Sequence, residues 1–255
     1  MKHLVRMIAL DLDGTLLRND KTISDYTISI LRECRNRGIK TIFATVRGAT
    51  TLFFDDTELF DGCLKNAGAT AFDGDELIYR QDISIAKIRP LLLACTENNI
   101  KAGVQVVGEQ MHYTNFDASA VWEYIDYFKI VDFADFNLNV VKFYALAHTA
   151  AEKEIIRRYL PDCARIFVCR EDITFAFNKN AVKSEAAMAL ARRWNIKQNE
   201  VAAFGDDIVD IEFLQWAGVG VAVGNALGEV KEAANYICGT NENDGVAKWI
   251  EQYIL

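Results

Sequence analysis

The sequence has few prolines and histidines, and its cysteines lack the spacing of a redox or metal motif. Only 2 of the 255 residues are proline, so few helices or strands are interrupted. The six cysteines show no C-x-x-C spacing, which predicts buried free thiols in a reducing cytoplasm. His3, His112 and His148 are scattered and form no zinc-ligand pattern. These absences argue against a disulfide scaffold and a zinc site.

Positive charge and long apolar runs are also scarce. The chain has 28 Lys and Arg against 36 Asp and Glu, a net charge of -8, which argues against nucleic acid as a partner. No apolar run reaches the length of a membrane span, and the N-terminus leads directly into a strand without a signal-peptide pattern. With 51% hydrophobic residues, we expect a globular cytoplasmic protein of one or two domains with no membrane partner.

The most informative stretch lies near the start of the chain. The apolar run from Leu4 to Leu10 ends in Asp11-Leu12-Asp13-Gly14-Thr15. A short run bounded by a turn predicts a strand buried on both faces. Ligands of open parallel sheets bind just beyond the carboxyl ends of strands, where these two aspartates would lie. Their mutual repulsion needs a cation or a proton, and a divalent metal with a phosphate ester would satisfy them. The alternative is an acidic turn that only caps the next segment.

A helix and a second strand complete a β-α-β unit. Ser24 is a suitable N-cap for a helix over residues 25–37, and Gly38 is a suitable end for it. Residues 39–45 predict a second buried strand, which a right-handed crossover places parallel to the first. We therefore expect Thr45, at the end of this strand, to lie beside the first acidic pair.

A third strand also ends at a polar residue. Residues 62–65 predict a short strand that leads to Asn66. This asparagine either faces the site or only makes a turn. Two short strands around Asp73-Gly74-Asp75-Glu76 then predict a hairpin.

The middle of the chain has a different pattern. Between residues 82 and 180 the predicted order is helix, hairpin, helix (residues 117–128), strand, helix, hairpin. Pro90 should kink or shorten the first of these helices. This order predicts an α+β domain inserted into an α/β core, with the core formed by residues 1–81 and 181–255. The alternative is one continuous domain.

Further polar positions follow the inserted block. A helix over residues 183–194 begins at Lys183, although a lysine in the first turn opposes the helix dipole. It is either functional or a solvated surface lysine. The next strand ends at Asp206, which suits a hard cation. Asp207 and Asp210 either join this site or favour the N-terminus of the next helix.

Together these residues resemble the four motifs of the haloacid dehalogenase superfamily. The first motif, D-x-D-x-T, corresponds to residues 11–15, and the hydroxyl of the second corresponds to Thr45. The lysine of the third motif corresponds to Lys183. The fourth, G-D-x-x-N-D, corresponds to residues 205–210, with Asp206 and Asp210 matching.

Two positions depart from the family pattern, and the inserted block narrows the resemblance. Val46 stands where the related T-G-R pattern has glycine, and Val209 replaces the usual asparagine of the fourth motif. The inserted block resembles the large C2-type cap of the Cof-like sugar phosphatase subgroup. The implied fold is a Rossmann-like parallel sheet core with an inserted α+β cap.

The resemblance implies a Mg²⁺-dependent phosphatase that hydrolyses small phosphomonoesters, sugar phosphates in particular, through an aspartyl-phosphate. Asp11 would be the nucleophile, and Asp13 would protonate the leaving oxygen and then activate water. Thr45, Arg47 and Lys183 would bind the phosphoryl oxygens. The implied partner is a small phosphorylated metabolite.

The implied metal ligands are Asp11, the backbone carbonyl of Asp13, and Asp206. Asp210 and Asn66 would support them from beside the site.

Two other functions use similar residues. A phosphomutase or phosphotransferase would return the phosphoryl group to a sugar, and a receiver-like module would bind phosphate without being an enzyme. The sequence specifies neither the physiological substrate nor the oligomeric state.

Overall fold

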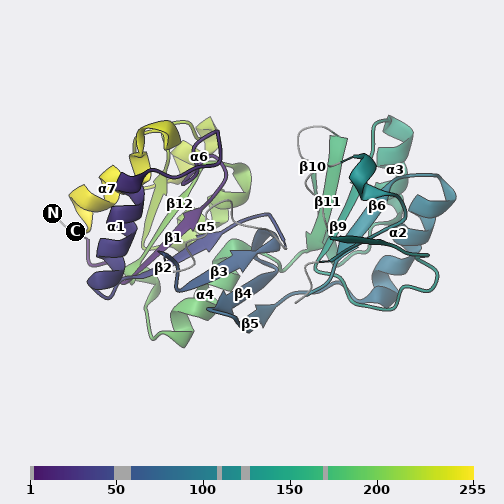
Figure 1. Cartoon of the computed structure of the whole chain (residues 1–255), viewed down its shortest axis with the longest axis horizontal. Helices are drawn as coiled ribbons and strands as arrows, with labels where there is room; N and C mark the ends of the chain where they lie inside the picture. Colours follow the sequence, from purple (N-terminus) through teal and green to yellow (C-terminus); the bar gives the residue numbers. More distant parts are fainter. Residues whose placement is uncertain (1–2, 49–58, 108–110, 122–126, 169–171) are drawn as a thin grey trace. The chain divides into compact units, whose positions relative to one another are not determined.

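The chain folds into two compact units. The computed structural model describes residues 3–48, 59–107, 111–121, 127–168 and 172–255. One unit contains residues 3–47, 59–80 and 182–255, and the other contains Gly48 and residues 81–181 (Figure 1). The first unit carries a largely parallel sheet and the second an almost entirely antiparallel one. The predicted fold class, an α/β core with an inserted α+β cap, is confirmed.

The first unit, which we call the core, contains an eight-stranded sheet of order β14-β13-β12-β1-β2-β3-β4-β5. The first six strands in this order run parallel, and β4 and β5 continue the sheet antiparallel. The bounds are β1 Met7–Asp11, β2 Lys40–Ala44, β3 Gly62–Lys65, β4 Thr70–Asp73, β5 Glu76–Arg80, β12 Val201–Gly205, β13 Val219–Ala222 and β14 Tyr236–Ile237. All five residues of β1 and of β12 are buried, as a strand covered on both faces requires.

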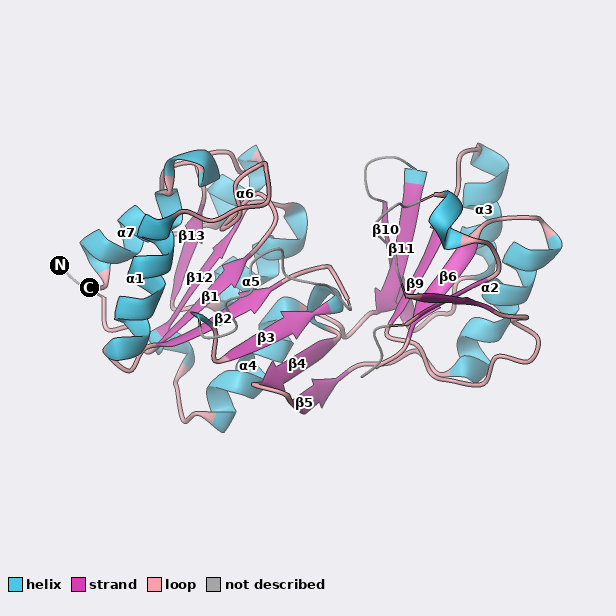
Figure 2. Ribbon diagram, viewed as in Figure 1, coloured by secondary structure: helices cyan, strands magenta, loops and turns pink. Residues whose placement is uncertain are grey.

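Helices cover both faces of this sheet (Figure 2). The chain leaves β1 toward β2 and leaves β12 toward β13, which are opposite directions, so right-handed crossovers place α1 and α5 on opposite faces. Helix α1 packs with α7, and α4 packs with α5. The bounds are α1 Asp25–Asn36, α4 Lys183–Arg193, α5 Ile211–Trp216, α6 Gly228–Ala233 and α7 Gly245–Tyr253. As predicted, the Ser24 side chain caps α1 by accepting a hydrogen bond from the backbone N–H of Thr27.

The order in which strands are added to the sheet reverses between β12 and β1, and at such a point open α/β sheets have the crevice in which they bind ligands. Within the parallel register Leu10 pairs with Phe204, and Asp11 pairs with Ala44. The carboxyl ends of the central strands are therefore level, and the residue after each end reaches the same edge of the sheet.

The inserted unit, which we call the cap, has a six-stranded sheet of order β10-β11-β9-β6-β7-β8. All neighbours are antiparallel except β7 and β8. Helices α2 and α3 pack against one face, in a buried cluster that includes Val104, Phe143 and Ile156. The bounds are α2 Ile85–Glu97, β6 Ala102–Gln105, β7 His112–Thr114, β8 Phe128–Ile130, β9 Lys142–Leu146, α3 Ala150–Tyr159, β10 Ala164–Val168 and β11 Ile173–Asn178.

One expectation about the cap needs correction. The helix predicted over residues 117–128 is wrong at both described ends, because residues 118–120 form a single 3₁₀ turn and Phe128 begins β8; residues 122–126 lie outside the described residues. Pro90 does not shorten α2, which continues to Glu97. Further 3₁₀ helices whose bounds lie within the described residues are Asn66–Gly68, Gln198–Glu200, Ile208–Asp210 and Asn241–Asn243.

The predicted buried free thiols are confirmed for three of the six cysteines, and Cys169 lies outside the described residues. Cys34, Cys63 and Cys95 are buried free thiols, and Cys163 and Cys238 are free and partly exposed. Within the described ranges, no helix combines the length and apolar character that crossing a membrane requires.

Candidate active site

Four neighbouring parallel strands end in polar side chains. In their order along the sheet, β12 leads to Asp206, β1 ends at Asp11, β2 leads to Thr45 and β3 leads to Asn66. Asp11, Thr45 and Asn66 are buried although they are polar. Because level strand ends bring these positions to one edge, the structure assembles residues that are up to 195 positions apart in sequence.

Lys183 lies at the centre of this arrangement. It is the first residue of α4, and its Nζ donates hydrogen bonds of 2.6 Å to both Asp11 Oδ1 and Asp210 Oδ1. The lysine is only 2% exposed, so it is not a surface residue. Burial lowers its pKa, but the charges of Asp11 and Asp210 outweigh burial and the pKa is raised. Lys183 is therefore held as an ammonium ion.

A close backbone approach places the start of α4 beside the sheet. Gly68 has a φ of +90°, and a Cβ at this position would lie 2.4 Å from the carbonyl carbon of Val182. A larger residue would push away the N-terminus of α4 and with it the Lys183 side chain.

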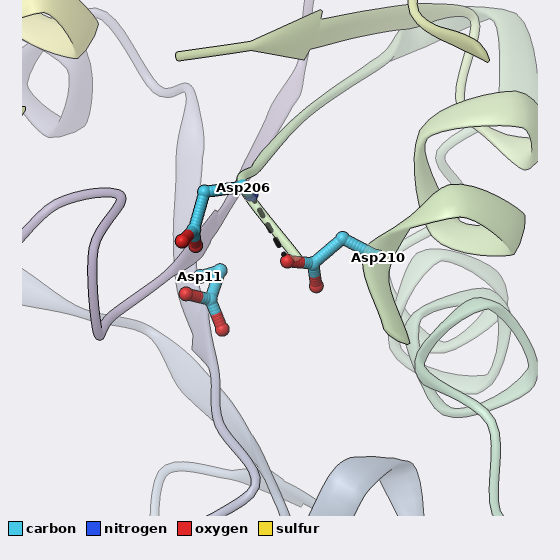
Figure 3. Close-up of side chains that lie close together, drawn as sticks. All are labelled: Asp11, Asp206 and Asp210. Atoms are coloured by element: carbon cyan, nitrogen blue, oxygen red, sulfur yellow. Dashed lines mark hydrogen bonds between the residues drawn. The ribbon is translucent and has the colours of Figure 1, made fainter. Parts of the chain in front are cut away.

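Asp11, Asp206 and Asp210 form an acidic cluster in which one oxygen from each lies within 4.8 Å of the others (Figure 3). Burial raises the pKa of Asp11 well above its ordinary value, against the charge of Lys183. Burial also raises the pKa of Asp206 to about 6, although the Thr15 hydroxyl donates a 2.8 Å hydrogen bond to Asp206 Oδ1. Three carboxylates around one ammonium leave negative charge without compensation, which favours a cation.

The oxygens of the cluster are not equally available to a metal ion. Asp210 Oδ1 accepts from Lys183, and Asp210 Oδ2 accepts from the backbone N–H groups of Asp206 and Asp207 at 3.1 and 3.2 Å. The carboxylate oxygens of Asp11 and Asp206 accept fewer hydrogen bonds than those of Asp210. Hard oxygen ligands of this kind fit a divalent cation such as Mg²⁺. Asp207, by contrast, is an exposed N-cap whose carboxylate accepts from the N–H of Ile208.

Asp13 lies in different surroundings from Asp11. It is partly exposed, and its Oδ1 accepts hydrogen bonds from Lys21 Nζ at 2.8 Å and from Arg47 Nη2. Burial raises the pKa of Asp13, but the hydrogen bonds and charges of Lys21 and Arg47 outweigh this and hold it below its ordinary value. The Asp13 side chain is not part of the acidic cluster.

The segment from Thr45 to Arg47 is fixed by its own contacts. The Thr45 hydroxyl accepts from the backbone N–H of Arg47 at 3.0 Å. The N–H of Asn66 donates to the carbonyl of Arg47 at 2.8 Å, and the N–H of Ala67 donates to the carbonyl of Thr45 at 3.0 Å. Val46 is not among the residues with positive φ, so this loop does not need the glycine of the related pattern.

Asn66 makes a turn and also leaves a polar atom without a hydrogen bond. Its φ is +53°, in the left-handed region that asparagine tolerates. Its side-chain Oδ1 is buried and has no hydrogen-bond partner among the described residues. The structure therefore shows the turn at Asn66, and a role for its side chain at the site stays a prediction.

Sequence reasoning missed three contributors to the site. Thr15 belongs to the first motif, but its hydrogen bond to Asp206 has no local sequence signal. Asn225 Nδ2 donates to the carbonyl of Gly14 at 2.7 Å and so holds the turn after Asp13. In the sequence, Lys21 is one charged residue of a polar turn. All three act across distances that a one-dimensional pattern does not show.

Comparison with known proteins identifies the family. A model of haloacid dehalogenase-like hydrolases matches residues 8–250, nearly the whole chain, and the protein belongs to this family. It is 27% identical over 262 residues to a 5-amino-6-(5-phospho-D-ribitylamino)uracil phosphatase of Bacillus subtilis, covering 97% of each chain. It is 26% identical over 273 residues to a pyridoxal phosphate phosphatase of Escherichia coli, covering 98% of this chain and 99% of the relative.

The fold recurs in solved structures. That of TM0651 from Thermotoga maritima superposes with a TM-score of 0.87 at 23% sequence identity, covering 98% of both chains. The predicted superfamily, its Cof-like subgroup and the enzyme class are confirmed. The match spans the cap as well as the core.

Proposed function

We propose that the protein is a Mg²⁺-dependent phosphatase that hydrolyses small phosphomonoesters through an aspartyl-phosphate on Asp11. The observation that carries this proposal is the contact of the Asp11 carboxylate with the buried Lys183 ammonium at the carboxyl end of β1. A nucleophilic carboxylate beside a fixed positive charge can approach an anionic phosphate, which it would otherwise repel.

In the first step an Asp11 oxygen attacks phosphorus, and the bond from phosphorus to the leaving oxygen breaks. Asp13 donates a proton to that oxygen. In the second step Asp13 takes a proton from water, which attacks the aspartyl-phosphate and restores Asp11. Asp11 is the last residue of β1 and Asp13 lies two residues further on, within the turn after the strand; in the proposed mechanism one bound phosphate reaches both.

Three side chains would hold the phosphoryl oxygens and stabilise their charge. Lys183 already lies 2.6 Å from Asp11. Thr45 follows the end of β2, the neighbour of β1, and its hydroxyl, which accepts from the N–H of Arg47, would donate its hydrogen to a phosphoryl oxygen. Arg47 contacts Asp13 and offers a planar guanidinium, which suits phosphate.

The proposed metal site uses Asp11, the backbone carbonyl of Asp13, and Asp206. Burial raises the pKa values of Asp11 and Asp206, and a bound cation would favour the charged form of both carboxylates. When bound, Mg²⁺ would neutralise charge between the carboxylate and the phosphate. Asp210 would support the site through Lys183 and the backbone N–H groups of the Asp206 turn.

We propose phosphate esters of primary alcohols as the substrate class, with sugar phosphates foremost. The two relatives named above act on a phosphoribityl compound and on pyridoxal phosphate. Both of these compounds carry the phosphate on a primary carbon. Because their remaining structures differ, they support the ester type and leave the rest of the substrate open.

A screen of phosphorylated metabolites tests the proposal. Purified protein with Mg²⁺ should release inorganic phosphate from a subset of primary phosphate esters, and exhaustive chelation should stop the release. Asp11→Asn should be inactive on the same substrates. Full activity after chelation would contradict the metal requirement. Appearance of an isomerised sugar phosphate without free phosphate would show a mutase instead.

A further inference from the structure

The loop after the first motif presents a lysine to Asp13. In this loop the N–H of Arg18 donates to the carbonyl of Thr22, and the N–H of Lys21 donates to the carbonyl of Arg18, both at 2.9 Å. Asp20 Oδ1 accepts from the N–H and the hydroxyl of Thr22. Lys21 adopts a φ of +67°, which is unfavourable for a residue with a Cβ. The surrounding contacts therefore hold Lys21 in a left-handed backbone conformation that is unfavourable for lysine.

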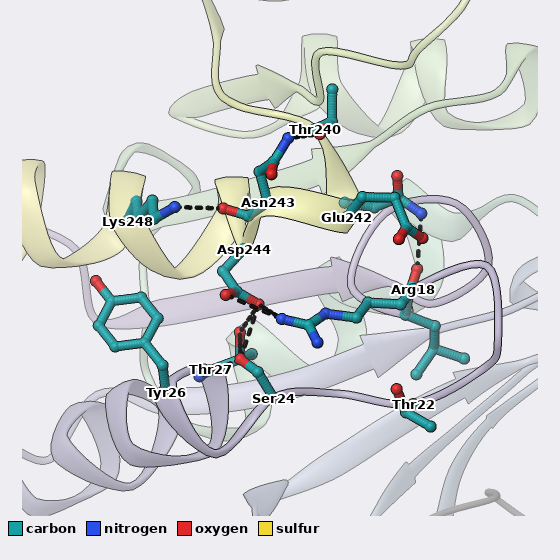
Figure 4. Close-up of polar contacts among 12 residues, drawn as sticks. Arg18, Thr22, Ser24, Tyr26, Thr27, Thr240, Glu242, Asn243, Asp244 and Lys248 are labelled. Atoms are coloured by element: carbon teal, nitrogen blue, oxygen red, sulfur yellow. Dashed lines mark hydrogen bonds and ion pairs between the residues drawn. The ribbon is translucent and has the colours of Figure 1, made fainter.

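Both ends of this loop are tied to one turn before α7 (Figure 4). Arg18 Nη2 donates to both oxygens of Asp244 at 3.0 and 3.1 Å, and the Ser24 hydroxyl donates to Asp244 Oδ1 at 2.7 Å. Between them, the N–H of Asn19 donates to Glu242 Oε1 at 2.7 Å. A segment from the far end of the chain thus fixes the loop that carries Lys21.

The geometry of the contact defines what Lys21 does to Asp13. Lys21 Nζ lies 2.8 Å from Asp13 Oδ1, the same oxygen that Arg47 contacts. Two cations on Oδ1 fix the rotation of the carboxyl group. The other oxygen, Oδ2, is then the one available to exchange a proton with a leaving group or water.

We propose that Lys21 is a positioning residue that holds the Asp13 carboxyl group in the orientation needed to protonate the leaving group. The inference rests on the proposed function. As Asp11 forms its bond to phosphorus, the electron pair of the breaking bond goes to the leaving oxygen, and the proton of Asp13 goes to that oxygen. Lys21 keeps its own protons and remains an ammonium ion throughout.

A leaving-group comparison separates this role from a merely structural one. The readout is kcat/KM, because it reports formation of the aspartyl-phosphate and is not affected by its hydrolysis. A primary alkyl phosphate needs the proton of Asp13, whereas 4-nitrophenyl phosphate does not. Because general acid catalysis is worth about 10²–10⁴-fold and misorientation forfeits a part of it, Lys21→Met should lower kcat/KM about tenfold on the alkyl ester. The loss on the aryl ester should be under about threefold, because there is little acid catalysis to lose.

Matched variants complete the experiment. Lys87→Met removes an exposed lysine of α2 and should leave kcat/KM unchanged for both substrates. Lys21→Arg should retain most of the alkyl activity, because it restores a cation at the same place. Asp244→Asn should give a smaller loss with the same preference, because it weakens the Arg18 anchor. Methionine meets the same positive φ as lysine, and a cooperative melting transition close to that of the parent confirms that the variant folds.

The outcomes distinguish this inference from the proposed function. If Asp13→Ala loses activity selectively on the alkyl ester but Lys21→Met loses it equally on both esters or not at all, the role of Lys21 is overturned. If Asp13→Ala itself shows no selectivity, the acid role of Asp13 fails and the role of Lys21 falls with it. If Asp11→Asn remains active, the proposed function fails independently of Lys21.

Discussion

Asp11 and Asp13 are two residues apart, yet the fold gives them opposite surroundings. Asp11 is buried among two further carboxylates and one lysine, and burial raises its pKa. Asp13 is partly exposed, and Lys21 and Arg47 outweigh burial and lower its pKa. Gly14 directly follows Asp13 in the tight turn after β1: its φ is +87°, and a Cβ there would lie 2.5 Å from Asp206 Oδ2. Within two residues the chain therefore passes from an anionic compartment around Asp11 to a cationic compartment around Asp13.

These pKa shifts indicate that each aspartate needs a bound ligand before it can perform its proposed task. A nucleophile must be ionised, whereas the pKa of Asp11 is raised. An acid must carry a proton, whereas the pKa of Asp13 is lowered. A divalent cation beside Asp11 would favour its ionised form. A phosphate that draws Arg47 away from Asp13 would remove part of the charge that lowers the Asp13 pKa. In the proposed mechanism, the metal ion and the phosphate would both have to bind before Asp11 and Asp13 reach the protonation states that their tasks require.

The largest expected effect is on the anionic compartment. Asp11→Asn should reduce phosphate release by at least about 10⁴-fold, because an amide cannot replace a carboxylate nucleophile. It also removes one of three crowded carboxylates while leaving Asp210 to pair with Lys183. The metal-free variant should therefore unfold at the same temperature as the parent or above it. Phosphate assays and calorimetry in chelator measure both; a strong fall in unfolding temperature would contradict the crowding.

The two lysines should differ in their contribution to stability. Lys183→Met leaves Asp11 and Asp210 buried without their cation, which should lower the free energy of unfolding by about 3–5 kcal/mol. Lys21→Met removes a partly exposed ion pair and should cost under about 1 kcal/mol. Urea denaturation in chelator measures both. Equal losses would show that the two compartments do not differ in burial as the structure has them.

The third effect is a pH dependence of metal binding. A metal ion and a proton compete for Asp206, whose pKa burial raises to about 6. The affinity for Mg²⁺ should fall by about tenfold or more per unit as pH drops below 6, because burial also raises the pKa of Asp11, the other carboxylate ligand. The free energy of unfolding of the metal-free protein should change in the other direction. The folded state binds this proton more tightly than the unfolded chain, so stability falls as pH rises from about 4 to about 6. Titration calorimetry and denaturation across this range test both signs.

The smallest effect concerns Thr15. Thr15→Val keeps the shape of the side chain but removes the hydrogen bond to Asp206 Oδ1, which should lower stability by about 1 kcal/mol. Mg²⁺ affinity near pH 7 should fall by a few-fold, because Asp206 loses a bond that favours its charged form. Thr96→Val, which removes a hydroxyl contact within α2, is the matched control and should leave Mg²⁺ binding unchanged.

The sequence also predicted the residues of the anionic compartment better than those of the cationic compartment. Strands β1, β2 and β3 and helix α4 were predictable because apolar runs and their end signals are local. Lys183 and Asp206 were predictable because each is adjacent to such an element. The Lys21 contact was not, because it depends on a loop held by Asp244, which lies more than 200 residues away. Strand β8 was missed since three residues at a sheet edge carry almost no periodic signal.

The central claim is that Asp11 accepts the phosphoryl group while Asp13 moves the protons, and trapping the intermediate tests it most directly. Asp13→Ala, mixed with 4-nitrophenyl phosphate and Mg²⁺ and quenched rapidly, should release a burst of 4-nitrophenol. Intact-mass analysis of the quenched protein should then show one phosphoryl group, located on Asp11, because its hydrolysis has lost its base. A variant with bound Mg²⁺ that shows neither a burst nor a phosphorylated species, and equal losses on alkyl and aryl esters, would contradict the claim.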